Sequence, residues 1–194
     1  MKLSKFIMPI ACLCLLTACD DKVSKEKFVQ EIENIQEHKY KKAIVKYSDD
    51  STNEKIDGKF TFTLVDGAYE NSDGSYYSSV ASYYLYLDIN AIVDNDGFSY
   101  YVNSVTEDDP KAKVKNTVNY YLNPFKIVAS FSSSATKDEG TEERKMEYTY
   151  KFDKYGNLTF MDHAVSIINS KKNDDAKYSI TTKQHFKMEI SYKD

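Results

Sequence analysis

The chain has 194 residues, of which 41% are hydrophobic and 29% charged, a composition typical of a globular protein with one domain-sized core. Its net charge of −4 argues against nucleic-acid binding, because proteins that bind phosphates cluster Lys and Arg. Only 6 Gly and 3 Pro are present, which excludes collagen-like and Gly/Pro-rich disordered chains.

Residues 1–18 have the features of a secretory signal peptide. Lys2 and Lys5 form its basic start, and the apolar run from Phe6 to Leu16 is shorter than the roughly 20 residues that span a bilayer. The sequence Leu16-Thr17-Ala18-Cys19 then resembles the bacterial lipobox, in which the Cys is diacylated and becomes the N-terminus. The alternative is an ordinary signal peptide followed by an unrelated Cys.

The distribution of cysteine supports lipidation. The chain has 3 Cys (Cys12, Cys14 and Cys19), and cleavage before Cys19 leaves that residue alone. A single unpaired thiol is unusual in a secreted domain, whereas an acylated Cys anchors the protein in a membrane. We therefore expect the membrane as a partner, through the lipid on Cys19, and the extracytoplasmic face of the cell membrane as the location. Cleavage also changes the net charge to −6, so that the lipid, and not a basic surface, must hold the protein there.

Residues 19–23 read as the lipidated Cys with a short polar tether, and residues 24–194 as a single domain. This domain begins with a predicted helix over 24–38, because Ser24 fits the N-cap position and apolar residues follow at helical spacing. The apolar stripe consists of Phe28, Ile32 and Ile35.

The apolar period changes from helical to alternating after Tyr40, which predicts strands. The first strand presents Ala43, Val45 and Tyr47 on one face. A polar loop follows over Ser48–Gly58, and a second strand presents Phe60, Phe62 and Leu64. We expect these two strands to pair as a hairpin with a long loop.

The middle of the chain is open to two interpretations. Apolar residues recur at helical spacing over 76–93, but Tyr83 to Ile89 also has the composition of a strand. The length of the pattern favours a helix over 76–93, which the turn-forming residues Asp94–Gly97 would end. A strand over 98–105 and a charged loop over 106–113 complete this region.

Five strand-like runs fill the C-terminal half, at about 115–122, 125–134, 145–153, 157–168 and 178–192. Asp153–Asn157 and Asn169–Lys177 have the composition of hairpin loops. In the last run, Phe186, Met188 and Ile190 alternate with charged residues, which predicts one covered and one solvent-exposed face. The predicted fold class is therefore α+β with an antiparallel sheet.

No metal site is expected. The 3 His are His38, His163 and His185, and no two of them have the spacing of a helical metal motif. Asp162 and His163 are adjacent in a strand and so point to opposite faces. The Asp- and Asn-rich segments 94–97 and 71–74 resemble calcium loops only superficially and are read as turns.

Catalytic motifs are also missing from the sequence. Ser132–Ser134 has no nucleophile-elbow glycines around it, and the paired carboxylates Asp108-Asp109 and Asp174-Asp175 lie in polar segments typical of solvated loops. No Gly-rich phosphate loop occurs. We therefore expect a protein that is not an enzyme and carries no cofactor.

Tyrosine is the remaining signal, with 17 Tyr, many of them in adjacent pairs such as Tyr76-Tyr77 and Tyr120-Tyr121. Its ring is apolar and its hydroxyl polar, which suits both partly exposed grooves and protein interfaces. The simpler interpretation is that most of these rings pack in the core and on the sheet of a protein that has no Trp.

The order of lipobox, tether, helix and antiparallel strands over residues 19–192 resembles bacterial lipoproteins of the LolA/LppX-like class. The phrases Tyr120–Phe125 and Phe152–Thr159 are similar to those of small Gram-positive lipoproteins. This resemblance implies a curved antiparallel sheet, or half-barrel, with the N-terminal helix and a second helix packed on one face, and an apolar cavity for acyl chains. No residue of this chain maps onto a specific ligand contact of that class.

Two functions follow as expectations. The first is a membrane-anchored, non-catalytic lipoprotein that binds an apolar or lipid-like ligand in the half-barrel. The second is a surface protein–protein interaction module that uses exposed Tyr side chains and has no ligand cavity. A hollow, apolar space between the sheet and the middle helix would favour the first.

Overall fold

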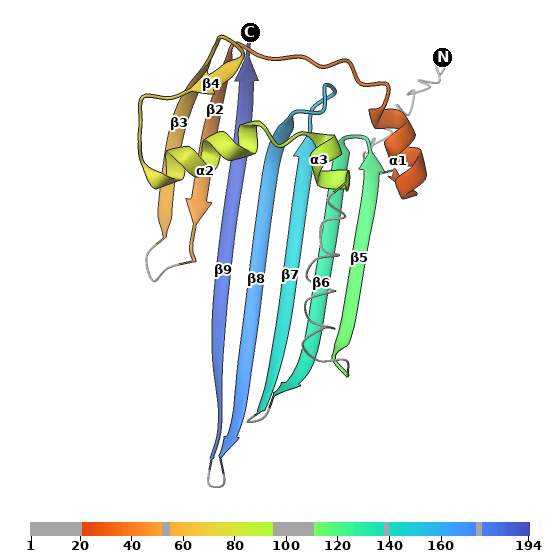
Figure 1. The fold of residues 1–194 in the computed structure, drawn as a ribbon, viewed down its shortest axis with the longest axis vertical. Helices are drawn as coiled ribbons and strands as arrows, with labels where there is room; N and C mark the ends of the chain where they lie inside the picture. The colour runs from red at the N-terminus through yellow and green to blue at the C-terminus, as the bar shows by residue number, and fades with distance from the viewer. Residues whose placement is uncertain (1–20, 52–54, 95–110, 138–139, 174–175) are drawn as a thin grey trace, which may run out of the picture.

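A computed structural model describes residues 21–51, 55–94, 111–137, 140–173 and 176–194. In this part of the chain, three short helices accompany one large antiparallel sheet (Figure 1). The helices are α1 (Lys25–Ile32), α2 (Tyr76–Leu85) and α3 (Ile89–Asp94). The strands are β1 (Lys22–Val23), β2 (Lys42–Asp49), β3 (Ile56–Val65), β4 (Ala68–Glu70), β5 (Lys113–Leu122), β6 (Phe125–Lys137), β7 (Gly140–Phe152), β8 (Leu158–Asn173) and β9 (Ala176–Lys193).

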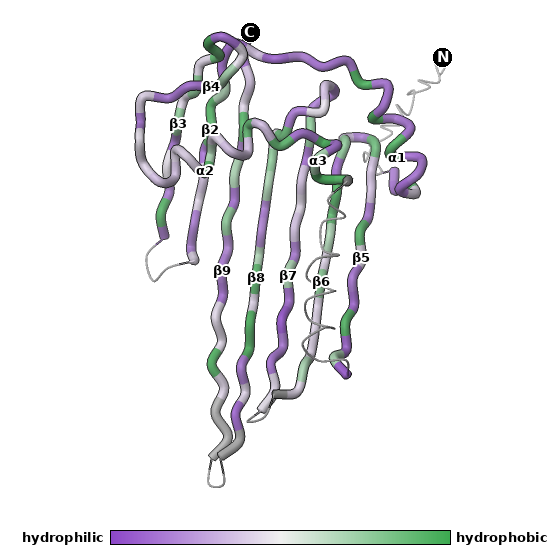
Figure 2. The backbone as a smooth tube through the Cα atoms, viewed as in Figure 1, coloured by the Kyte–Doolittle hydropathy of each residue, from purple (hydrophilic) through white to green (hydrophobic). Residues whose placement is uncertain are grey.

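The sheet has nine strands in the order β1-β5-β6-β7-β8-β9-β2-β3-β4, and it is open. Strands β5 to β9 form a meander in which each strand pairs with the next one in the chain. The β2–β3 hairpin joins this meander at β9, at the opposite end from β1. The chain therefore crosses the top of the sheet over residues 33–41, from α1 beside β5 to the start of β2 (Figure 1). This crossing segment is mostly hydrophilic (Figure 2).

The predicted class, α+β with an antiparallel sheet, is confirmed. The β2–β3 hairpin forms as expected, with Ala43 paired with Phe62 and Val45 paired with Phe60, and all four side chains are buried. The five C-terminal strands also lie close to their predicted ranges. The alternation of apolar and polar residues predicts these strands correctly, because one face of this part of the sheet is covered by other side chains.

The predicted hairpin loop over Asn169–Lys177 is wrong. Strand β8 continues to Asn173 and β9 begins at Ala176, so the hairpin extends far beyond β2 on one side and slightly beyond the last β7–β8 pair, Gly140 with Lys171, on the other (Figure 1). Residues 169–173 of β8 are Asn, Ser, Lys, Lys and Asn, so this part of the strand has none of the polar–apolar alternation that identifies a half-buried strand. The predicted strand over 98–105 lies outside the described residues.

Helix α1 begins where predicted but is shorter than the expected range of 24–38. The Ser24 hydroxyl accepts a hydrogen bond from the Lys27 N–H at 3.2 Å, which caps the helix. The helix ends at Ile32, and a tight turn follows in which the Ile35 N–H donates to the Ile32 carbonyl at 3.1 Å. Ile35 still packs against the core, so its place in the apolar stripe comes from this turn.

The middle segment is helical, as favoured, but it forms two helices instead of one. Helix α2 ends at Leu85, and α3 starts at Ile89 after a short linker. The Asp88 carboxylate accepts a hydrogen bond from the Ala91 N–H at 2.7 Å and so caps the first turn of α3. The predicted end of the helix, Asp94–Gly97, lies outside the described residues apart from Asp94, the last residue of α3.

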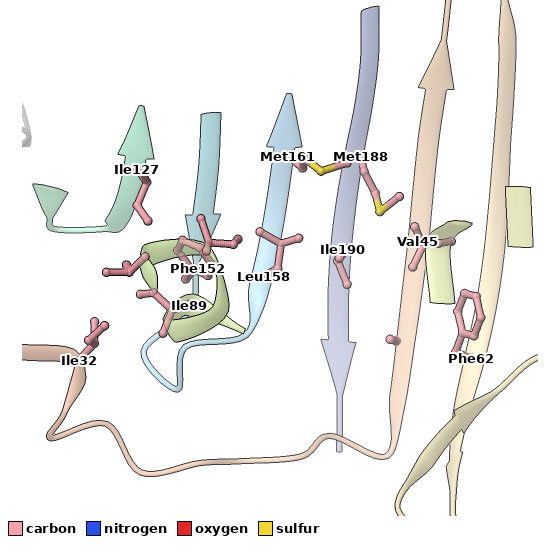
Figure 3. Packing of buried hydrophobic residues seen from close by; sticks show 14 of the residues in the cluster. Ile32, Val45, Phe62, Ile89, Ile127, Phe152, Leu158, Met161, Met188 and Ile190 are labelled. Atoms are coloured by element: carbon pink, nitrogen blue, oxygen red, sulfur yellow. The ribbon is translucent and has the colours of Figure 1, made fainter. Parts of the chain in front are cut away.

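The main core lies between the helices and the upper part of the sheet. Figure 3 shows Ile89 of α3 beside Phe152 and Leu158, with Met161, Met188 and Val45 continuing the apolar layer across the sheet. Ala81 of α2 and Ile92 and Val93 of α3 are buried in the same cluster. Side chains of α2 and α3 thus pack against the upper part of the sheet, in the region where the sequence suggested that a cavity could lie.

Most tyrosines of the described part pack as the simpler interpretation predicts. Tyr120 is buried, and Tyr47 lies stacked between Phe60 and Tyr77, with ring centroids 5.3 and 4.8 Å away. Three tyrosines of α2 and the linker are exceptions, because Tyr76, Tyr83 and Tyr86 are 75%, 64% and 54% exposed.

Candidate functional site

A pocket with a volume of about 480 Å³ lies at the top of the molecule, under the crossing segment. Four parts of the chain line it: the end of α1 with residues 33–39, the β3–β4 turn with Tyr69, residues 85–90, and the β7–β8 loop. Its apolar lining consists of Ile32, Ile35, Leu85, Leu87 and Ile89. Ile32 and Ile89 are buried, and they lie on the same side of the core in Figure 3.

The break between α2 and α3 creates one wall of this pocket. Because Asp88 caps α3, the chain leaves α2 and turns at Tyr86 and Leu87 before the next helix begins. Leu87 is half-buried and lines the pocket, although it also packs against the edge of the core. A continuous helix would not place residues 85–90 in this way.

The β7–β8 loop forms the floor, and Asp153 holds its shape. The Asp153 carboxylate accepts hydrogen bonds from the backbone N–H groups of Tyr155 at 2.8 Å and Asn157 at 3.0 Å. Gly156 has a φ of 78°, which an L-residue with a side chain rarely adopts. Its backbone also lies against Ile89 and Ile35, so this glycine makes close contact between the loop and the apolar lining possible.

Two hydrogen bonds attach the crossing segment to this loop. The Tyr40 hydroxyl donates to the Asp153 carboxylate at 3.0 Å, and the Asn157 side-chain amide donates to the His38 carbonyl at 3.1 Å. Burial of the ring, followed by the hydrogen bond to Asp153 and the negative charge of that residue, raises the pKa of Tyr40 to about 12. Tyr40 therefore remains a neutral donor at physiological pH, and the loop and the segment are held together.

Replacing Tyr40 with Phe should test this attachment. The variant keeps the ring, which stacks on Tyr192 with centroids 4.9 Å apart, and removes only the hydroxyl. A hydrogen bond to a charged group contributes about 1.5–3 kcal/mol. Because Asp153 keeps its two backbone donors in the variant, we expect the free energy of unfolding to fall by an amount at the lower end of this range, about 1.5 kcal/mol. Urea unfolding monitored by circular dichroism gives this value, and a loss below about 0.5 kcal/mol would contradict the role of the hydroxyl.

Aromatic rings surround the pocket. The Tyr69 hydroxyl donates to the Tyr40 carbonyl at 2.9 Å, and the Tyr69 N–H donates to the Tyr86 hydroxyl at 2.6 Å. His38 lies with its ring centroid 4.8 Å from that of Tyr155, and its Nε2 is 2.9 Å from the Asp194 carboxylate. These contacts fix the rings at the rim, where each presents an apolar face with a polar edge.

The charged side chains that line the pocket are mainly acidic. Glu33, Glu37 and Asp88 carry negative charge, and Lys39 is the one basic side chain among the described lining residues. All four side chains are exposed, so they do not act as buried charges; they set the electrostatic potential at the entrance, or mouth, of the pocket. This field disfavours an anionic ligand and favours a neutral or cationic one.

Two further hollows lie on the opposite face of the sheet. The first, of about 440 Å³, has Lys113, Lys115 and Lys145 beside Ser132, Ser134 and Ser166. The second, of about 500 Å³, has Lys46, Lys59 and Lys187 beside Asp57 and Glu189. Although most of the surface that lines them is apolar, neither hollow brings together isoleucine and leucine side chains from several segments as the upper pocket does.

His163 lies on the helix side of β8 among tyrosine rings. Its ring centroid is 4.4 Å from that of Tyr148, 5.3 Å from that of Tyr150 and 6.3 Å from that of Tyr84 on α2. The Nε2 atom is buried and has no hydrogen-bond partner among the residues that the structure describes. Burial disfavours the charged imidazolium and lowers the pKa of His163 to about 4, although the neighbouring Asp162 partly opposes the shift.

This depressed pKa predicts a loss of stability in mild acid. The His163 side chain takes up a proton near pH 6.5 in the unfolded chain but only near pH 4 in the folded protein. The free energy of unfolding is therefore unaffected by His163 above pH 6.5, and it decreases as the pH falls from 6.5 toward 4. At pH 5 the loss should be about 2 kcal/mol, since each pKa unit corresponds to about 1.4 kcal/mol. Urea unfolding at pH 7.5 and at pH 5 gives the decrease in the free energy of unfolding between the two pH values. This decrease should be smaller for His163→Phe than for the natural sequence, by about 2 kcal/mol. Equal decreases in the two proteins would contradict the prediction.

The structure does not bring the three histidines together. His38 lines the upper pocket and His163 lies within the tyrosine cluster. His185 lies on the opposite face, with its Nε2 2.8 Å from the Asp162 carboxylate and its Nδ1 3.6 Å from that of Asp50. No group of three or more His, Cys, Asp or Glu side chains with the geometry of a metal site occurs among the described residues.

Of the other residues considered from the sequence, those that the structure describes do not line the upper pocket. Ser132–Ser134 is part of β6, within the meander. Asp108-Asp109, Asp174-Asp175 and Cys19 lie outside the described residues. In the part of the chain that was searched, no helix has both the length and the apolar composition needed to cross a membrane.

Sequence reasoning missed the pocket because its residues come from four separate segments. One available signal was Asp88, which precedes Ile89, Ile92 and Val93 as an N-cap precedes a helix. That signal would have predicted the helix break, and with it one wall. The Asp88 signal would not have predicted that residues 33–39 lie over the wall formed by residues 85–90.

The fold and the pocket define a small α+β protein with an open antiparallel sheet and a pocket that combines an apolar wall, an aromatic rim and a polar mouth. Comparison of the chain with known protein families, with curated proteins and with solved structures finds no significant match.

Proposed function

We propose that this protein is a lipid-anchored, extracytoplasmic lipoprotein that is not an enzyme, and that it holds a small apolar or amphipathic ligand in the upper pocket. The observation that carries the proposal is the pocket itself, with isoleucine and leucine walls and an aromatic rim. Its volume of about 480 Å³ lies within the range of about 300–1,000 Å³ that is usual for small-molecule sites. The proposed anchor is the lipid on Cys19, at the extracytoplasmic face of the cell membrane.

The position of α1 supports a role close to the membrane. Four residues, 20–23, lie between Cys19 and the N-cap Ser24, so the Cα atoms of Cys19 and Ser24 are at most about 18 Å apart. Helix α1 has eight residues and ends at Ile32, which lines the pocket. Lipidation at Cys19 would therefore place the pocket within reach of a molecule that leaves or enters the bilayer.

The open antiparallel sheet with short helices supports the proposed relation to the LolA/LppX-like class. In that relation the upper part of the sheet forms the half-barrel, with the N-terminal helix and the middle helices on one of its faces. The proposed ligand site lies at the end of this half-barrel, under residues 33–39, because side chains of α3 fill the interior.

The negative charge at the entrance of the pocket limits the kinds of ligand that the pocket can bind. A fatty-acid or phospholipid anion would have to approach Glu33, Glu37 and Asp88, whereas a neutral or cationic head would be attracted. The aromatic face of Tyr69 also suits a cation, whereas the Tyr155 ring already has the Lys154 ammonium 4.7 Å from its centroid. We therefore propose a ligand with an apolar body and a neutral or cationic head.

Binding of the neutral fluorescent probe N-phenyl-1-naphthylamine tests the pocket. We expect saturable fluorescence with one probe per chain, and loss of this signal in Leu87→Arg, which places a charge in the apolar wall. Val65→Arg is the matched control, because Val65 is a hydrophobic residue, 41% exposed, that does not line the pocket. Equal binding by the two variants would contradict the pocket assignment.

Lipidation is tested separately with Cys19→Ala in the full chain. The natural sequence should partition into the detergent phase and carry the added mass of acyl chains, and the variant should do neither. If both proteins partition alike, Cys19 is not the anchor, whatever the pocket binds.

A second function, as a protein-interaction module, is favoured by one observation, the exposure of Tyr76 and Tyr83 on α2. Exposed tyrosines are common at interfaces. Replacement of both with Ser should abolish crosslinking to a protein partner in intact cells while leaving probe binding unchanged. A crosslinked partner that is insensitive to these substitutions would count against this function.

A further inference from the structure

The hairpin of β8 and β9 has one long edge that no described strand covers. Strand β2 pairs with β9 only over Phe186–Lys193, although β9 begins at Ala176. Below β2, the outer edge of β9 is therefore open within the described part of the chain (Figure 1). Residues 179–184 are exposed along this edge.

The hydrogen bonding next to β2 shows which residues point their backbone groups outward. The Asp50 N–H donates to the His185 carbonyl at 3.0 Å, so His185 directs its backbone polar groups toward the β2 side. In an antiparallel sheet these directions alternate along a strand. Residues 183, 181, 179 and 177 therefore direct their N–H and C=O groups to the open edge, and the even-numbered residues direct theirs to β8.

This edge has few of the features that usually prevent edge-to-edge pairing. Natural proteins protect an exposed edge with Pro, a β-bulge, several charges or a short strand. Over residues 176–184, β9 has no Pro, and the strand-forming residues Ile180, Thr181 and Thr182 lie between its two lysines, Lys177 and Lys183. Its pairing with β8 also runs from Glu189 to Ala176 without a shift in register.

We propose that this edge pairs with the same edge of a second copy of the chain, antiparallel and with two-fold symmetry about Ser179. In this register, backbone residues 177, 179 and 181 of one copy pair with 181, 179 and 177 of the other. All three present outward N–H and C=O groups, so every backbone group in the central part finds a partner. The pairing joins the two sheets into one continuous sheet.

The fold selects this register over its neighbours. A two-fold centred on Ser179 places Ala176 of one copy beside Thr182 of the other, clear of Asp50. Centring on residue 180 places Ala176 beside Gln184, directly next to the position that Asp50 occupies beside His185. Centring on residue 178 leaves only residues 177 and 179 with outward-facing partners among the strand residues. The Ser179 register gives the most pairs without a collision, and it places no lysine opposite its own symmetry copy.

Disulfide formation in the full chain tests the register directly. Residues that face each other across such a pair have Cα atoms about 5.5 Å apart, which is within the range for a disulfide. Ser179→Cys should therefore form a reducible dimer on mild oxidation. Thr182→Cys is the matched control, because its symmetry copy lies six residues along the strand, about 20 Å away. The natural sequence, with Cys12, Cys14 and Cys19, gives the background.

A second variant measures the pairing without a cysteine. Ser179→Pro removes an N–H group that points away from β8, so it should leave the β8–β9 hairpin intact and weaken the dimer at least about tenfold in sedimentation equilibrium. Circular dichroism verifies that the variant is folded. The proposal is overturned if Ser179→Cys gives no more dimer than Thr182→Cys, if it crosslinks to a different protein, or if the natural sequence remains monomeric.

Discussion

Replacing Phe28 with Ala is expected to lower the free energy of unfolding by about 3–5 kcal/mol, the usual cost of removing a fully buried aromatic ring. Phe28 is 0% exposed, and its ring centroid lies 5.1 Å from that of Tyr120 and 5.8 Å from that of Phe125. Apart from Ile32, which is 5% exposed, it is the only buried residue of α1, so its ring is the main contact that holds α1 on the sheet. Urea unfolding at pH 7.5 measures the loss.

The matched control for Phe28 is Glu31→Ala on the same helix. Glu31 is exposed, and Ala is the better helix former, so this variant should remain within about 0.5 kcal/mol of the natural sequence. A loss below about 1 kcal/mol for Phe28→Ala would mean that α1 does not dock on β5 as described. Because α1 carries Ile32, the Phe28 variant should also bind the neutral probe more weakly.

Replacing Gly156 with Ala is expected to cost about 2–3 kcal/mol, from backbone strain and from overpacking together. Its φ of 78° is unfavourable for Ala, and a Cβ atom there would lie 3.1 Å from Ile89 Cγ2 and 3.8 Å from Ile35 Cδ1. The new methyl group therefore pushes on the apolar lining of the pocket.

Gly67 provides the control, because it separates the two causes. Its φ of 85° imposes similar strain, but nothing lies within 4 Å of a Cβ atom at that position. Gly67→Ala should therefore cost only about 1 kcal/mol, the value for strain alone. Equal losses in thermal or urea unfolding for the two variants would contradict the close packing of the β7–β8 loop against Ile89.

The sequence predicted the parts of the fold in which one face is covered. Ala43 and Val45 alternate with exposed or half-exposed neighbours because the β2–β3 hairpin packs on one side only. Where a strand is polar throughout, as over residues 169–173 at the end of β8, no alternation identifies it, and a loop was predicted instead. The spacing of apolar residues shows which side chains are buried, and it identifies a strand or a helix only when one face of that element is buried.

The pocket could not be predicted for a different reason. The apolar spacing of residues 76–93 continues through Leu87, so a helix and a broken helix have nearly the same pattern. The difference depends on Asp88, which caps α3. The pairing of residues 33–39 with the β7–β8 loop depends on Tyr40 and Asp153, which are 113 residues apart, and no local pattern records such a contact.

The position of β2 in the sheet has a consequence for biosynthesis. Its eight residues, Lys42–Asp49, pair with Phe186–Lys193, so the β2–β3 hairpin has no place in the large sheet until the last strand has been made. The crossing segment must stay loose over the growing meander during this time. Contacts between such distant parts of a chain slow the acquisition of the native state, and they expose unpaired strands to aggregation. Maturation of this protein therefore waits for Phe186–Lys193, and a chain truncated before Phe186 would lose the pairing that joins the early hairpin to the rest of the sheet.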